Sequence, residues 1–178
     1  AALKDAREAI GAFTVRFESA YTEEMRRKLG LLQSRAGDLA LAQDLLERMA
    51  RNSADFTLTF RRLCDAAADP ARGAPVRALF ADPVAFDEWA VTWRQRLAED
   101  GGLDRECSAA MRAANPLFIP RNHRVEQAIS AAVNDNDFVP FEMLLTVLSS
   151  PYADQPGHEI YAEPPRPDEI VQQTFCGT

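Results

Sequence analysis

The residues from Asn115 to Asn122 place a helix stop, an extended bridge and a helix start within eight positions, and this arrangement strongly limits the possible fold. The residue before a proline is pushed out of the right-handed helical region, so a helix is expected to end at Asn115-Pro116. Pro120 fixes a second backbone angle and removes a hydrogen-bond donor. Asn122 is a favourable N-cap for a following helix. The sequence therefore predicts two helices joined by a short extended bridge.

Apolar residues recur at helical spacing through the rest of the first 150 residues, and Gly30 is a natural helix stop. The side chains expected to face inward from the first and the last two helices are Phe13, Phe17, Ala20, Met25, Leu29, Val125, Ala128, Ile129, Ala132, Phe141, Leu144, Leu145 and Leu148. The expected N-caps are Asp38, Asp55, Asp82, Asp104, Asn122 and Asp137. Strand-like alternation and internal repeats do not occur at useful length. The prediction is an all-α fold of six to seven helices.

The chain is expected to form one helical domain, residues 1–150, followed by an extended tail, residues 151–178. Five prolines and glycines in the tail disfavour regular structure: Pro156, Gly157, Pro164, Pro165 and Pro167. A turn-rich stretch at residues 69–75 is the best candidate for an internal break. The chain starts without Met and within a helical pattern, so it is expected to be a fragment of a longer protein.

Composition narrows the function classes. A net charge of −7 argues against a general nucleic-acid binder, because phosphate contacts need clustered positive charge. No apolar run is long enough to suggest a membrane span, so no membrane partner is expected. Three cysteines are too few for a disulfide scaffold, which favours a cytoplasmic protein. His123 and His158 share no ligand spacing with the cysteines, so a zinc site is not expected, and His123 is expected to be exposed or to contact the bridge.

No catalytic arrangement is apparent in the sequence. Gly101-Gly102 lacks the spaced glycines of a nucleotide-binding loop, and residues 134–138 are interpreted as a turn between helices. No serine, histidine and acidic residue can be argued into a triad. We therefore predict no catalytic, cofactor-binding or metal-ligating residue within these 178 residues.

Three separated blocks identify a resemblance to a known family. They are Asn115-Pro-Leu-Phe-Ile-Pro-Arg-Asn-His-Arg-Val-Glu-Gln-Ala-Ile129, then Ser149-Ser-Pro-Tyr-Ala-Asp-Gln-Pro-Gly157, and then Cys176 as the third residue from the end. In this order they resemble the C-terminal region of the selenoprotein O (SelO, YdiU-like) family. Weaker similarity at residues 25–32 and 54–63 extends the resemblance over the whole chain. Family members have a kinase-like fold, hence the description pseudokinase, and act as protein adenylyltransferases.

The resemblance implies that ATP, magnesium and the catalytic groups belong to a kinase-like core upstream of Ala1. The full-length protein would be a bacterial cytoplasmic enzyme that transfers AMP to hydroxyl side chains of other proteins (AMPylation). Its kinase-like core and its protein substrates would be the partners of this chain. The position of Cys176 holds cysteine or selenocysteine in the family and can pair with a cysteine of that core, which implies a redox role. Many relatives continue with two serines, whereas this chain ends in Cys176-Gly-Thr, so the flanking contacts differ.

Alternatives remain open from the residues alone. Arg121, Asn122 and Arg124 could hydrogen-bond the kinase-like core or a phosphate. In the structural interpretation, which we favour, Asn122 caps its helix and Arg121 packs against a neighbouring helix end. For the chain as a whole, the alternative functions are a free-standing helical interaction module and, disfavoured by charge, a helix-turn-helix nucleic-acid binder.

Overall fold

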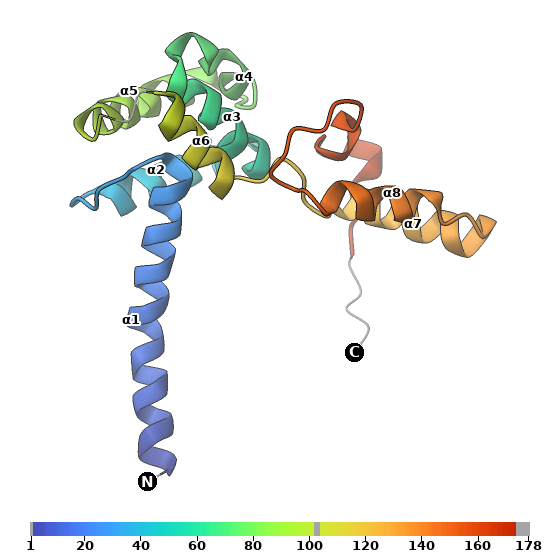
Figure 1. Cartoon of the computed structure of the whole chain (residues 1–178), viewed down its shortest axis with the longest axis horizontal. Coiled ribbons are helices and arrows are strands. Elements are labelled where there is room, and N and C mark those ends of the chain that lie inside the picture. Colours follow the sequence, from blue (N-terminus) through green and yellow to red (C-terminus); the bar gives the residue numbers. More distant parts are fainter. Residues whose placement is uncertain (1, 102–103, 174–178) are drawn as a thin grey trace. The chain divides into compact units, whose positions relative to one another are not determined.

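The computed structural model describes residues 2–101 and 104–173, which contain eight α-helices and no strand (Figure 1). The α-helices are α1 (Ala2–Leu29), α2 (Asp38–Arg51), α3 (Phe56–Ala68), α4 (Ala74–Arg77), α5 (Pro83–Glu99), α6 (Arg105–Ala114), α7 (Asn122–Asp135) and α8 (Val139–Leu148). Three short 3-10 helices are η1 (Pro70–Gly73), η2 (Glu159–Tyr161) and η3 (Pro167–Glu169). The all-α prediction is confirmed. The count exceeds six to seven because the predicted linker at residues 69–75 contains η1 and the start of the four-residue α4.

Two compact units make up the chain, Ala1–Ala114 and Asn115–Thr178. The division falls where α6 ends, at the Asn115-Pro116 pair that forces the helix to stop. It does not fall at residues 69–75, because Val76 of α4 is fully buried in the core of the first unit. The sequence-based boundary at residue 150, between a helical domain and an extended tail, stays a prediction. No helix in the described part of the chain is long and apolar enough to cross a membrane.

Two tryptophans lie at the centre of the first unit. Trp89 and Trp93 of α5 are almost fully buried and stack with ring centroids 5.4 Å apart. Each indole nitrogen has a partner: Trp93 Nε1 donates to the carbonyl of Leu29 and Trp89 Nε1 donates to that of Leu41, both at 2.9 Å. Because the polar atom of each ring is hydrogen-bonded, both large side chains can be buried without an unpaired donor. The bonds also connect α5 to the end of α1 and to α2.

Three of the six expected N-caps are confirmed. Asp55 accepts from the Leu58 amide, Asp82 from the Val84 amide and Asp104 from the Cys107 amide, so these three caps are confirmed. Asp38 is not a cap. The N-cap of α2 is Gly37, in the left-handed conformation, and Asp38 is the first helical residue. Asp137 is not an N-cap, because the N-cap of α8 is Phe138, although Asp137 Oδ1 accepts from the Val139 amide at 2.9 Å.

Asp38 is instead the buried centre of a charged cluster. Its carboxylate accepts from Arg96 Nε at 2.8 Å and from the Arg35 amide at 2.9 Å, and lies 3.6 Å from Arg26 Nε. The side chain of Asp38 is only 2% exposed. Because Arg26 belongs to α1 and Arg96 to α5, the carboxylate holds both helices against the start of α2.

Residues 10–20 of α1 are exposed, except for Ala12, which is partly buried. This part of α1 extends away from the other helices of its unit (Figure 1). Met25 and Leu29 are buried as predicted, but Phe13 and Phe17 are more than half exposed, so the expectation that they face a core is wrong for the described unit. The rings of Phe13, Phe17 and Tyr21 stack along the helix. Helical spacing places apolar residues on one face, but only neighbouring elements can bury that face.

In the second unit, α7 and α8 lie side by side (Figure 1). Ala128 and Leu144 are buried as predicted, whereas Ile129, Phe141 and Leu145 are about half exposed or more, which contradicts their assignment to the core. A small core forms instead around three other buried residues, Phe118, Val147 and Ala162. The segment after Pro151 therefore packs onto the unit through Ala162, although its described residues, 152–173, contain only short 3-10 helices.

Candidate functional site

The bridge between α6 and α7 holds the start of the tail. The amides of Leu117 and Phe118 both donate to the carbonyl of Pro151, at 2.8 and 3.1 Å. Phe118 is 1% exposed and packs against Val147 and Ala162, on α8 and in the tail. The extended conformation that Pro116 and Pro120 favour leaves these amides free to bond outside a helix.

The start of α7 differs from the predicted arrangement. The Arg121 amide donates to the Ile119 carbonyl at 2.8 Å across Pro120, a three-residue turn. Arg121 then has an extended backbone and is the N-cap, while Asn122 is already helical and exposed. No side-chain hydrogen bond caps the helix, so the prediction that Asn122 does so is wrong. The last non-helical position is therefore Arg121, one residue earlier than predicted.

Arg121 is buried, as are Asn115 and His123. Burial of an arginine and a histidine at a helix start is unusual, because both side chains carry polar groups that must be satisfied. Of the two alternatives for His123, solvent exposure is wrong, and a contact with the bridge stays a prediction. The residue is 3% exposed, and burial, with the positive charge of Arg124 as the next largest cause, lowers its pKa. The imidazole is therefore neutral near pH 7.

Glu169 attaches the tail to α7. Its carboxylate accepts from Gln127 Nε2 at 3.2 Å and from the Arg166 amide at 3.0 Å, and lies 3.9 Å from Arg124 Nη1 and 3.1 Å from Arg166 Nη2. The hydrogen bond from the Arg166 amide, together with the charges of Arg166 and Arg124, lowers the pKa of Glu169. The carboxylate is therefore ionised at neutral pH, and these four residues form what we call the Glu169 cluster.

Sequence reasoning missed the Glu169 cluster, although a signal was present. Pro167 at the first position of a helical turn and Glu169 at the third are typical of a helix start, although Arg166 at the N-cap lacks the acceptor of a complete capping box. Here the Glu169 side chain does bond back to the Arg166 amide. No local pattern indicates that Gln127 and Arg124 of α7 contact Glu169, because both are far from Glu169 in the sequence.

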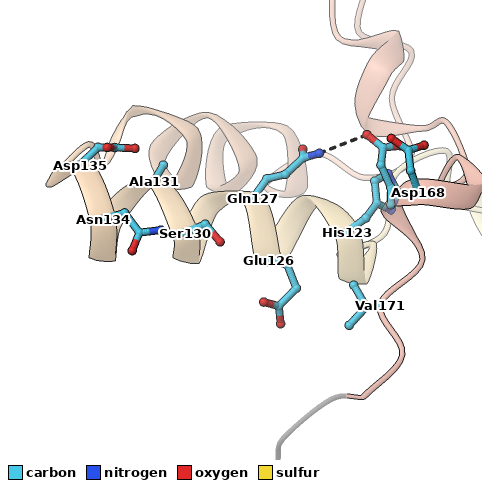
Figure 2. Close-up of a pocket in the computed structure, with 10 residues that line it drawn as sticks. His123, Glu126, Gln127, Ser130, Ala131, Asn134, Asp135, Asp168 and Val171 are labelled. Atoms are coloured by element: carbon cyan, nitrogen blue, oxygen red, sulfur yellow. Dashed lines mark hydrogen bonds between the residues drawn. The ribbon is translucent and has the colours of Figure 1, made fainter.

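A groove runs along α7 beside the Glu169 cluster (Figure 2). Its volume is about 490 Å³. The lining residues are His123, Glu126, Gln127, Ser130, Ala131, Asn134, Asp135, Asp168, Glu169 and Val171. His123 and Asp168 lie toward one end of the groove, and Asn134 and Asp135 lie toward the other (Figure 2). A smaller cavity of about 330 Å³, lined by the bridge and by residues 165 and 169–171, also touches His123.

Two of the three cysteines are buried in the first unit. Cys64 has no exposed surface, in agreement with its interpretation as a buried thiol, and its Sγ donates to the Phe60 carbonyl at 3.3 Å. Cys107 Sγ donates to the Gly30 carbonyl at 3.6 Å, and burial raises its pKa to about 11. Cys176 lies outside the described residues, and its redox role stays a prediction.

Thiol labelling should distinguish these cysteines. At about pH 8 only roughly one part in a thousand of Cys107 is thiolate, and the thiolate is the reactive form. We expect a thiol reagent such as DTNB to modify one thiol per folded chain and three per chain in urea. A Cys176→Ser variant should lose the single fast reaction. Fast modification of two or three thiols in the folded chain would contradict the buried positions of Cys64 and Cys107.

Within residues 2–101 and 104–173, no group of three or more His, Cys, Asp or Glu side chains is placed to hold a metal ion. The bridge, the Glu169 cluster and the groove all belong to the second unit. The contacts of the bridge and of the Glu169 cluster fix where residues 151–171 run along α7 and α8.

Comparison with known proteins places the chain in a family. The family model described as "Protein adenylyltransferase SelO" matches residues 1–149. This chain belongs to the SelO family. Its similarity to "Protein nucleotidyltransferase YdiU" of Bradyrhizobium diazoefficiens is 57% identity over 99% of the chain and 36% of that relative. The proteins of the same name from Rhodopseudomonas palustris (strain BisB5) and Nitrobacter winogradskyi are each 54% identical, over 97% and 99% of the chain and 35% of each relative.

The chain thus spans only about a third of the length of these SelO-family relatives, and it is a fragment by comparison with them. The resemblance inferred from the Asn115–Ile129 and Ser149–Gly157 blocks is confirmed at the level of the family. The names of the family and of these relatives support nucleotidyl transfer as the general activity of the family.

Proposed function

We propose that this chain is the C-terminal helical part and redox tail of a SelO-type pseudokinase that transfers AMP from ATP to hydroxyl side chains of proteins. In this proposal the chain is structural and regulatory, and ATP, magnesium and the catalytic groups are held by the remainder of the protein. The observation that carries the proposal is the attachment of the tail at Pro151 and at Glu169. Cys176 follows Glu169 by seven residues in the sequence.

Exposed apolar side chains support a role in packing against the rest of the protein. In the first unit they include Phe13 and Phe17, and in the second Phe141 and Leu145. Exposed apolar surface of this kind typically marks an interface. The occupant we propose is the kinase-like core of the same protein, because relatives are nearly three times as long as this chain. The two surfaces would be covered in the longer protein.

Attachment of the tail supports a regulatory role for Cys176. A fixed point at Glu169 restricts the volume that the last residues can explore, which raises the effective concentration of the thiol near any nearby partner. Two thiols that form a disulfide release two electrons and two protons to an oxidant, such as oxidised glutathione, and reduction reverses the step. We expect the partner cysteine in the kinase-like core, so that the oxidation state of the pair controls AMP transfer.

Labelled-AMP transfer tests the proposal. The samples are the full-length protein, the 178-residue chain, and full-length Cys176→Ser, each with oxidised or reduced glutathione. We expect transfer by the full-length protein with a clear difference between the two conditions, and no transfer by the 178-residue chain. Cys176→Ser should lose the difference, because a serine cannot form a disulfide.

Cys64→Ala serves as the matched control, since it removes another thiol that is buried. It should keep the redox dependence. AMP transfer by the 178-residue chain alone would show that catalysis lies within it and refute the structural role. A redox dependence that persists in Cys176→Ser would remove the regulatory role of the tail.

A further inference from the structure

The tail has two attachments of different chemistry within the second unit. Ala162 is buried in the small apolar core of that unit. Further along, the Glu169 carboxylate accepts from Gln127 Nε2 at 3.2 Å and lies 3.9 Å from Arg124 Nη1. Burial of an apolar side chain does not change with pH, whereas a contact between charged groups depends on protonation. The two attachments should therefore respond differently to acid.

Residues 165–171, which we call the strap, depend on the second attachment. Among the described residues, no main-chain hydrogen bond joins the strap to α7. Residues 165–168 and Ile170 are exposed, and only Glu169 and Val171 are partly buried. Segments with few buried contacts open at a low cost in free energy. A change of charge beside Glu169 is therefore sufficient to shift the strap between attached and released states.

His123 is buried at the start of α7, next to the strap. It lines both cavities of this region, and Glu169 and Val171 line each of them with it. Figure 2 shows His123 at the same end of α7 as Asp168. His123 is 3% exposed, and its Nε2 atom is buried without a hydrogen-bond partner in the described structure. The neutral ring fits this position, because an unprotonated nitrogen needs no acceptor.

A protonated His123 does not fit this position. Both nitrogens of a charged imidazole are donors, so Nε2 would be a buried donor without an acceptor. The charged residues around the ring, on α7, on the bridge and on the strap, are Arg121, Arg124, Glu126, Arg166, Asp168 and Glu169. Burial and the arginines outweigh Glu169 and lower the pKa of His123 below its ordinary value of 6.5. Release of the strap would expose the ring to water, which solvates the charged form.

We propose that mild acid releases the strap from α7 through protonation of His123, while the tail up to Ala162 stays attached. The ring takes up a proton from the solvent when the strap lifts, and the charged imidazole then opposes reattachment. The inference concerns the second unit alone and does not depend on the proposed function.

Acid weakens the attachment because the attached state binds fewer protons at His123 than the released state does. The attachment is strongest above pH 6.5 and weakens as the pH falls below that value. If attachment lowers the pKa of His123 by about one, acid weakens it about tenfold. The pKa of Glu169 is lowered from 4.5, so its carboxylate stays ionised down to about pH 5 and His123 acts alone in this range.

NMR of the 178-residue chain tests the strap. The readouts are heteronuclear NOEs of the Ala162, Asp168 and Val171 amides and the pH titration of the His123 ring. Between about pH 7.5 and about pH 5, the NOEs of Asp168 and Val171 should fall with the midpoint of His123, while that of Ala162 stays constant. Constant values at Asp168 and Val171, or a fall at all three positions, would contradict release of the strap.

His123→Gln removes the titrating group, so the strap should stay attached over the same pH range. His158→Gln is the matched control, since it removes the other histidine of the chain, and it should keep the response. A response that persists in His123→Gln, or one that is lost in His158→Gln, would overturn the assignment to His123.

Glu169→Gln tests the coupling without a change at His123. Loss of the carboxylate should release the strap at about pH 7.5, and the pKa of the newly exposed His123 should rise toward 6.5. If the strap stayed attached, removal of the negative charge by itself would lower the pKa of His123 further. A higher pKa in this variant supports the proposal, and an unchanged or lower pKa overturns it.

Discussion

Replacement of Asp38 by alanine is expected to lower the free energy of unfolding by about 3–5 kcal/mol, because it removes one partner of a buried ion pair and leaves the other. Asp38 is 2% exposed at its side chain, and Arg96, its closest partner, is 11% exposed. Alanine would leave the Arg96 guanidinium in a poorly solvated site with one fewer acceptor. The substitution also removes the acceptor of the Arg35 amide and the ion pair between Asp38 and Arg26.

Urea unfolding followed by tryptophan fluorescence measures this effect. Both tryptophans, Trp89 and Trp93, lie in the core of the first unit, so the signal reports on that unit. Asp44→Ala is the control, since Asp44 pairs with Arg48 at 2.9 Å on α2 but is about half exposed. Its loss should cost about 0–1 kcal/mol. An Asp38→Ala effect as small as that of the control would mean that the buried cluster contributes little.

Gly30→Ala is expected to destabilise the first unit by about 2–4 kcal/mol, from two additive causes. Gly30 has a φ of 76°, in the left-handed region that side chains disfavour. A Cβ atom at this position would also lie 2.7 Å from Cys107 Sγ and 2.8 Å from Met111 Sδ, inside van der Waals contact. Because both sulfur atoms belong to buried residues of α6, relief requires a shift in the core.

Gly37→Ala separates the two causes. Gly37 also has a left-handed φ, 94°, but no heavy atom lies within 4 Å of a Cβ built there. Its substitution should cost about 1–2 kcal/mol from backbone strain alone. Urea midpoints of the two variants, measured by tryptophan fluorescence, give the difference. Equal losses in the two variants would show that α6 yields to the added methyl group without cost.

Fold class and most helix boundaries could be predicted because their signals are local. Asp55, Asp82 and Asp104 cap their helices through amides two or three residues away. α1 ends directly before Gly30, and α6 ends two residues before Pro116. Asp38 has the same local signal as these caps, yet it lies in a charged cluster whose partners are up to 58 residues distant in sequence. A local sequence pattern cannot indicate a partner that is so far away in the sequence.

The candidate site was predicted only in part. The Asn115–Ile129 block identified the family and the bridge, but the roles of its residues came from the structure. Asn122 does not cap, and His123 is buried. The Glu169 cluster could not be predicted, since Gln127 and Glu169 are 42 residues apart.

The sequence by itself determined the all-α class, the stop at Asn115-Pro116 and membership of the SelO family. Each rests on local backbone preference or on motifs that the chain carries in its residues. Only the tertiary structure decided which apolar faces are buried and where the tail is held. Phe17 and Leu29 share one helical pattern, yet Leu29 contacts Trp93 and Phe17 remains exposed. Burial depends on which elements meet in space, and helical spacing alone does not contain that information.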